Sequence, residues 1–251
     1  MDVQLTAIPA ALRSRGTEND YGPERAALAD APLPEHVDLR RPWHTVRDQG
    51  HTASCVGWTV SEALRWHLVE QGRLEPDEPL SARHIWMAAK ETDKRTDYPS
   101  TFLEEDGTSL KAGLDVVRKF GAVLERELPW TGVLAAGSPD AYYASAGDRK
   151  VLAYFNLFDA PDRFHEWRKW LHQNGPVLVL LKVDRNLWNA QLTAFDPGTA
   201  DGSHAAALFG YGPDHFLLRS SWGPGWGEQG YARMSLDYAT AAVIESYGVM
   251  V

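Results

Sequence analysis

The sequence predicts an α+β protein of two lobes, because its helical and strand patterns fall in different halves of the chain. Apolar residues spaced by three or four dominate residues 54–121, whereas short apolar runs separated by Gly, Pro and Asp dominate residues 177–234. Segregated helices and strands are typical of α+β folds. We expect a helical lobe over about 37–135 and a β-rich lobe over about 136–251, both after an N-terminal arm formed by residues 1–36.

The first predicted helix begins after Ser54 and ends near Gly72, since Ser is a favoured N-cap and Gly a favoured helix stop. One of its faces carries apolar residues at helical spacing: Val56, Val60, Ala63, Leu64 and Leu68. A second helix is expected after Ser81, and it contains Ile85, Trp86, Ala88 and Ala89.

Two more helices carry start and stop signals. Thr108 or Ser109 caps the third helix, which ends at Gly121. Its apolar face consists of Leu110, Leu114, Val117 and Phe120. The fourth helix is predicted from the cap Asp159 to Asn174-Gly175, with Pro161 in its first turn.

The strands come after residue 175. The run 177–183 is apolar and partly β-branched, and three further runs follow at short intervals, over 205–211, 215–220 and 230–234. Between the two patterns, residues 142–150 are predicted to form a polar loop.

Composition narrows the class of function. The net charge is −9, from 25 basic and 34 acidic side chains, which argues against a nucleic-acid or anionic-membrane partner and favours neutral or basic substrates. A single cysteine excludes an intramolecular disulfide, as in a reducing compartment. No apolar run reaches the ~20 residues of a membrane span, and no signal peptide precedes the charged residues of the N-terminus. A cytoplasmic location is therefore the expectation.

The one cysteine, Cys55, lies where the first helix begins, and His204 lies far downstream. A lone thiol with a distant histidine is the pattern of a nucleophile and its base, and the positive end of a helix dipole stabilises a thiolate. Two simpler interpretations stay open from position alone. A lone cysteine is often a small buried hydrophobe, and most of the nine histidines of the chain are expected to be structural or exposed.

Several segments decide between these interpretations. In chain order they are Val37-Asp38-Leu39-Arg40, Val46-Arg47-Asp48-Gln49-Gly50, Ser54-Cys55, Leu80-Ser81, Asp106-Gly107-Thr108-Ser109-Leu110, Gly175-Pro176-Val177, Ser203-His204-Ala205, Gly210-Tyr211-Gly212, Ser221-Trp222-Gly223-Pro224-Gly225-Trp226-Gly227 and Gly230-Tyr231. In this order and spacing, over residues 37 to about 236, the chain resembles the papain-like cysteine peptidases, particularly the compact bacterial members without disulfides.

The resemblance implies a papain-like fold with the site in a cleft between the lobes, and a role for each matched residue. Cys55 would attack the scissile carbonyl, and His204 would form an ion pair with it and protonate the leaving amine. Gln49 would donate to the oxyanion together with the backbone N–H of Cys55. Trp222 would shield the pair from water. Ser220 occupies the position of the family's asparagine, which orients the catalytic histidine. The shorter serine side chain could accept the imidazole hydrogen bond, or water, a backbone carbonyl or a residue from elsewhere would orient the ring.

The resemblance also implies a substrate-binding surface. Gly107 would let an extended substrate backbone approach and pair as an added strand. Thr108, Ser109 and Ala205 would line part of the pocket for the substrate's second residue. Ala53 replaces the family's glycine beside the nucleophile, and its methyl group narrows the pocket for the first residue. Gly107 alone is equally interpreted as a turn glycine before a helix cap.

Three functions are compatible with this sequence. The first is a cysteine peptidase that hydrolyses peptide or isopeptide bonds of a peptide or protein substrate through an acyl-enzyme. The second is an acyl transferase, ligase or deamidase that uses the same thiol, and the third is a non-catalytic peptide binder, as the serine at position 220 allows. No metal or organic cofactor is expected, because His165 and His172 lack ligand spacing. Residues 1–36 are too short for an inhibitory domain, although they are long enough to lie in the cleft or to undergo self-cleavage.

Overall fold

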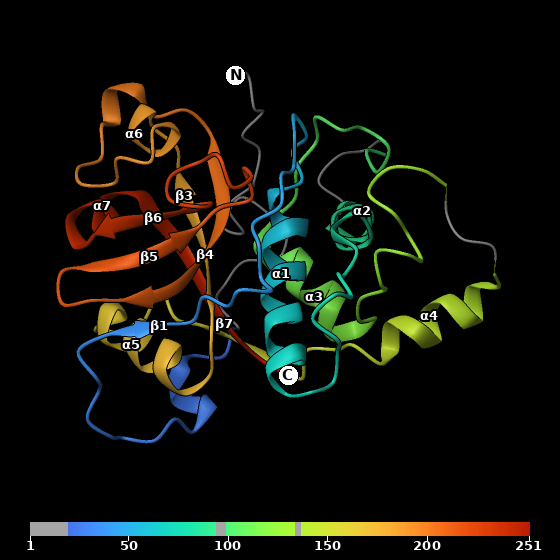
Figure 1. Ribbon diagram of the computed structural model, residues 1–251, viewed down its shortest axis with the longest axis horizontal. Coiled ribbons are helices and arrows are strands. Elements are labelled where there is room, and N and C mark those ends of the chain that lie inside the picture. Colours follow the sequence, from blue (N-terminus) through green and yellow to red (C-terminus); the bar gives the residue numbers. More distant parts are fainter. Residues whose placement is uncertain (1–19, 94–98, 134–136) are drawn as a thin grey trace.

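Two lobes meet along one central helix in the computed structural model, which describes residues 20–93, 99–133 and 137–251. Figure 1 shows the sheet on one side and the other helices of the first half on the opposite side, with α1 (Cys55–Glu70) between them. The segregation of helices and strands that the sequence predicts is therefore present. Helices of the first half of the chain and strands of the second half both pack against α1.

The β-rich lobe is built on an antiparallel sheet with the strand order β2-β7-β3-β4-β5-β6, and β1 pairs with β4 outside this path. The bounds of the strands are β1 Val37–Asp38, β2 Ala153–Asn156, β3 Val177–Lys182, β4 Ser203–Tyr211, β5 His215–Arg219, β6 Tyr231–Ser235 and β7 Val243–Met250. The four runs predicted as strands correspond to β3 through β6. The sequence pattern does not predict β1, β2 or β7, and β7 lies in the sheet between β2 and β3.

The helical lobe packs α2 (Ala82–Asp93) and α3 (Leu110–Lys119) against α1. Glycines allow the close approach, because a Cβ on Gly57 would lie 2.4 Å from the Ala82 carbonyl oxygen and one on Gly113 would lie 2.8 Å from Val56. Ser81 and Ser109 cap α2 and α3 as predicted, accepting hydrogen bonds from His84 N and Ala112 N. The first turn of α1 is thus fixed between two neighbouring helices.

The remaining helices are α4 (Pro139–Gly147), α5 (Arg163–Gln173), α6 (Arg185–Trp188) and α7 (Leu236–Ala242), with 3-10 turns at Pro23–Ala26 and Pro197–Thr199. The predicted loop over 142–150 was wrong, since most of it belongs to α4. Ser138 caps this helix and Pro139 follows in its first turn. The start of α5 was also misplaced, because Asp162 and not Asp159 accepts the capping bond from His165 N.

The core has two main parts, one on each face of the central sheet. Beneath α5 the buried side chains are large and aromatic, with Trp167 and Trp170 fully enclosed. On the other face, the apolar side of α1 packs against Leu178 and Leu180 of β3. The predicted inward position of Phe120 was wrong, because its side chain is 43% exposed just beyond the end of α3.

Residues 20–36 run along the β-rich lobe. The Asn156 amide donates to the Tyr21 carbonyl at 2.7 Å, and Ala29 exchanges two hydrogen bonds with the Gln173 side chain on α5. The Tyr211 hydroxyl donates to the Pro34 carbonyl at 2.9 Å. This part of the predicted arm is therefore packed against the sheet and α5, and the remainder of the arm, residues 1–19, lies outside the described residues. None of the described helices is long and apolar enough to cross a membrane.

Candidate active site

A short backbone ladder brings the segment before Cys55 against the segment after β5. The Gln49 amide donates to the Ser221 carbonyl at 2.8 Å, and the Gly223 amide donates to the Arg47 carbonyl at 3.2 Å. Asp48 and Trp222 form the antiparallel bridge between these two bonds. Residues more than 170 positions apart in the sequence thereby become neighbours across the two lobes.

Cys55 is the first residue of α1 and is buried, with 1% of its surface exposed. Ser54 occupies the N-cap position as predicted, yet its side chain makes no capping bond, and its hydroxyl lies 2.6 Å from that of Thr52. The positive end of the helix is therefore not neutralised by a side-chain cap. An anion next to the first turn, such as a thiolate or a substrate oxyanion, gains from this dipole.

His204 lies on β4 opposite the first turns of α1. The Thr59 hydroxyl, one turn beyond the thiol, donates to the Ala205 carbonyl at 2.9 Å. This bond fixes the residue next to His204 against the helix that carries Cys55. The predicted nucleophile and base, 149 positions apart, thus lie on two elements in direct contact.

Ser220 reaches the imidazole despite its short side chain, because its Oγ lies 3.2 Å from His204 Nε2. Pairing of β5 with β6 fixes the serine, whose amide donates to the Gly230 carbonyl at 3.1 Å. The other ring nitrogen, Nδ1, is buried and makes no hydrogen bond within the described part of the chain. Ser220 of the β-rich lobe therefore holds Nε2, and Nδ1 is the ring nitrogen that can exchange a proton.

Burial controls the charge of His204, whose side chain is fully enclosed. Loss of hydration lowers the pKa of the imidazole from 6.5 to about 3. Alone, this ring is neutral at physiological pH. A stable imidazolium at this position requires a nearby negative charge, which a Cys55 thiolate would supply.

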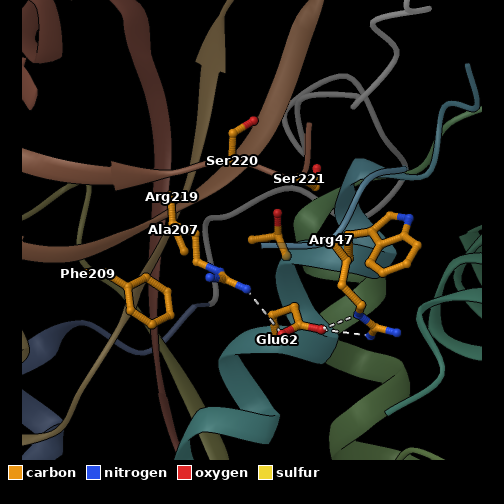
Figure 2. A pocket seen from close by; sticks show the side chains of 9 residues that line it. Arg47, Glu62, Ala207, Phe209, Arg219, Ser220 and Ser221 are labelled. Carbon is orange, nitrogen blue, oxygen red and sulfur yellow. Dashed lines mark hydrogen bonds and ion pairs between the residues drawn. The ribbon is translucent and has the colours of Figure 1, made fainter. Parts of the chain in front are cut away.

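Gln49 is held at both ends of its side-chain amide. The Ser221 hydroxyl donates to Oε1 at 2.6 Å, and Nε2 donates to the Thr52 carbonyl at 2.7 Å. Because a primary amide carries two N–H groups, one N–H remains for a substrate oxygen. Ser221, shown beside Ser220 in Figure 2, was not given a role from the sequence, although it opens the Ser-Trp-Gly motif.

Trp222 covers His204, and two further tryptophans pack against Trp222. The indole of Trp222 lies 4.3 Å from the imidazole between ring centroids, and Trp188 stacks on Trp222 at 4.6 Å with an interplanar angle of 12°. Trp226 meets Trp222 edge-on at 5.6 Å. Sequence analysis did not identify Trp188, since nothing in its local pattern distinguishes it from a core residue. The cluster restricts water on this side of the imidazole.

The residues expected to bind substrate lie on two loops and on β4. The Ala53 amide donates to the Glu104 carbonyl at 2.9 Å, which links the segment before the thiol to the loop before α3. The hydroxyls of Thr108 and Ser109 are buried and donate to Asp93 of α2, at 3.2 and 3.3 Å. These two hydroxyls therefore face the interior of the helical lobe, and Gly107 before them is buried as well. Ala205 is fully buried.

Among the described residues, no group of three or more His, Cys, Asp or Glu side chains is placed to hold a metal ion.

Comparison with known proteins identifies the family. The model of the family described as "Papain family cysteine protease" matches residues 33–251, which is most of the chain. The chain belongs to the papain family of cysteine proteases. The resemblance inferred from the motifs is confirmed.

Individual relatives are distant in sequence. Cysteine proteinase RD21A of Arabidopsis thaliana is 25% identical over 225 residues, which are 84% of this chain and 44% of that protein. Germination-specific cysteine protease 1 of Arabidopsis thaliana is 24% identical over 230 residues, 86% of this chain and 56% of that protein. The papain-family chain thus spans about half the length of these relatives.

A solved structure confirms the papain-like fold. The crystal structure of xylellain, a cysteine protease from Xylella fastidiosa, aligns with a TM-score of 0.79 and 22% identity, covering 100% of this chain and 97% of that one. The predicted α+β class and the two-lobe arrangement are therefore correct.

Proposed function

We propose that this papain-family chain is a cysteine peptidase that hydrolyses peptide or isopeptide bonds through an acyl-enzyme on Cys55. The observation that carries the proposal is the 3.2 Å contact between His204 Nε2 and Ser220, made on the strand that Thr59 ties to the first turns of α1. An imidazole held at Nε2 presents Nδ1 for proton exchange with the thiol and the substrate.

Acylation begins with transfer of the thiol proton of Cys55 to His204 Nδ1. The thiolate attacks the scissile carbonyl carbon, and the C–N bond breaks as the imidazolium donates its proton to the leaving amine. The negative charge on the carbonyl oxygen is stabilised by the free N–H of Gln49 and by the positive end of α1. Water then attacks the thioester with His204 as base, which releases the acid and restores the thiol.

The substrate is a peptide or protein segment in extended conformation. We infer that its backbone pairs with the chain beside Gly107, because the side chains of the next two residues point inward to Asp93. Thr108 and Ser109 then shape the second-residue pocket through their backbone, and Ala53 limits the first. The cytoplasmic location and the absence of nucleic-acid and membrane partners stay predictions.

Acyl transfer is the second candidate, and burial of the reacting pair favours it. Cys55 is 1% exposed and His204 is fully buried, so an amine that brings its own contacts competes well with water for the thioester. The product mass separates the two reactions, since hydrolysis adds one water to the peptide and ligation adds none.

The pH profile of Cys55 alkylation tests the proposal directly, and the absence of any second cysteine makes the label unambiguous. An ordinary thiol reacts near its pKa of ~8.5. We expect rapid alkylation by iodoacetamide down to about pH 5–6, because the thiolate pairs with His204. His204→Ala abolishes this acid limb, whereas the control His36→Ala, at an exposed histidine, leaves it unchanged. A wild-type thiol that reacts only above pH 8 contradicts the proposal.

A further inference from the structure

The buried carboxylate of Glu62 contacts three arginines and one histidine near the site residues. Glu62 of α1 accepts from Arg47 Nε and Nη2 at 3.1 and 2.7 Å, from Arg219 Nη2 at 3.3 Å and from Arg65 Nη1 at 3.4 Å. His44 Nε2 lies 2.7 Å from the same carboxylate. Figure 2 shows Arg47 and Arg219 reaching Glu62 from opposite sides. We call these five residues the Glu62 cluster.

The cluster joins segments that come from both lobes. Arg219 lies at the end of β5, and its guanidinium also donates to the carbonyls of His44 and Thr45 at 2.9 and 3.1 Å and to the Tyr231 hydroxyl at 2.8 Å. His44 and Thr45 lie in the loop that leads to α1, whereas Tyr231 belongs to β6. The guanidinium therefore fixes the end of β5 against the loop before α1.

Three charged members of the cluster are close in sequence to residues of the proposed catalytic machinery. Glu62 lies two turns after the nucleophile on the same helix, Arg47 precedes Gln49 by two residues, and Arg219 immediately precedes Ser220. One carboxylate thus sets the relative position of the helix with the thiol, the loop with the oxyanion donor and the strand end that orients the imidazole.

The surroundings allow little freedom of movement. The side chain of Glu62 is 8% exposed and that of Arg219 is 3% exposed. Arg219 lies over the ring of Phe209 and Arg47 over the ring of Trp58, at 5.4 and 4.5 Å from the ring centroids. The space left between these side chains is about 10 Å³, room for one water at most. Glu62 and Arg219 therefore have little room to rotate, whereas the side chain of Arg47 is 26% exposed.

We propose that Glu62 is a positioning residue for catalysis, which aligns Cys55, Gln49 and Ser220 through its ion pairs with Arg47 and Arg219. This inference rests on the proposed peptidase function. It differs from a purely structural role, because it requires the rate of each correctly folded molecule to depend on the carboxylate. A displacement of about 1 Å between reacting groups lowers a rate by about a hundredfold.

The test compares Glu62→Gln with a matched control on the same helix. Glu70 of α1 also forms a two-bond ion pair with an arginine of the preceding loop, Arg41, but this pair is partly exposed and distant from the site residues. Active thiols are first counted with excess iodoacetamide. We then measure the alkylation rate at pH 6 and kcat/KM on a peptide substrate, both per active thiol, for wild type, Glu62→Gln and Glu70→Gln.

We expect both rates per active thiol to fall at least tenfold in Glu62→Gln and to stay within about twofold of wild type in Glu70→Gln. The double variant Glu62→Gln/Arg219→Gln, in which two amides replace the pair, should recover part of the rate that the single variant loses. Equal rates per thiol in Glu62→Gln and wild type overturn the inference, even if fewer molecules fold. A wild type that alkylates rapidly at pH 6 but cleaves no peptide overturns the proposed function and leaves the alkylation comparison to decide on Glu62.

Discussion

Glu62 and Asp184 are both buried carboxylates, but Glu62 forms ion pairs whereas Asp184 accepts hydrogen bonds from uncharged donors. Burial alone would raise the pKa of the Glu62 carboxyl, but the hydrogen bond with His44 and the positive charges of Arg47 and Arg219 hold it well below its ordinary value. Within the described part of the chain, Asp184 accepts hydrogen bonds from uncharged donors, which are Leu187 N at 2.9 Å, Asp196 N at 2.7 Å and the Tyr238 hydroxyl at 2.5 Å.

The reach of the two clusters also differs. All partners of Asp184 lie in the β-rich lobe, so this carboxylate organises one lobe internally. The partners of Glu62 come from both lobes. Its ion pairs hold the loop before α1 and the end of β5 together, although no continuous strand or helix connects these segments. We therefore expect Asp184, whose donors are local and uncharged, to support stability. We expect Glu62, whose partners come from both lobes, to support the geometry of the site.

The largest predicted effect comes from Asp184→Ala, which leaves three donors without their acceptor. We expect the free energy of unfolding to fall by roughly 3 kcal/mol, measured by urea denaturation at pH 7.5. The rate per active thiol should change less than in Glu62→Gln. Asp214→Ala, an exposed carboxylate of the same lobe paired with His215, is the control and should stay within about 0.5 kcal/mol. If Asp184→Ala removes activity per thiol and spares stability, the contrast between the two carboxylates is wrong.

The next effect is a loss of stability in acid, to which a histidine of the Glu62 cluster and a histidine outside it both contribute. Burial lowers the pKa of His67 on α1 from 6.5 to about 4, and burial together with Arg219 lowers that of His44 to about 4. Since the folded pKa lies below the unfolded one, the unfolded chain binds protons first as the pH falls. Stability is therefore complete above pH 6.5 and decreases from there toward pH 4.

His67 supplies the cleaner measurement of this effect. Between pH 7.5 and pH 5 it should account for about 2 kcal/mol of lost unfolding free energy. His67→Leu should flatten the curve of urea-derived unfolding free energy against pH by that amount. An unchanged slope in His67→Leu shows that His67 is protonated equally in the folded and unfolded chain.

The smallest predicted effect concerns the end of β5 that the Glu62 cluster holds. Ser220→Ala leaves the buried Nε2 of His204 without its partner, and we expect kcat/KM per active thiol to fall about tenfold. Ser220→Asn supplies an acceptor on a longer side chain and should retain most of the activity. Equal rates in wild type and Ser220→Ala would show that another group orients the imidazole.

Local signals in the sequence were sufficient for most elements. Serine caps placed α2 and α3, and apolar runs placed β3 through β6, because caps and burial periodicity act over a few residues. The failures are also physical. The helix α4 has almost no apolar stripe, since only Ala146 of it is buried, so periodicity could not detect it although Ser138 and Pro139 signalled its start.

The order and spacing of the motifs determined the family, the papain-like fold and the candidate pair Cys55 and His204 without reference to any contact. Only the tertiary structure decided whether Ser220 reaches the imidazole, which N–H of Gln49 stays available, and how one carboxylate connects three segments of the site. The reason is that most of these contacts join residues between 15 and about 170 positions apart, such as Arg47 with Glu62 and Gln49 with Ser221. Their distances depend on how the two lobes pack against α1, and no local preference of the chain encodes that geometry.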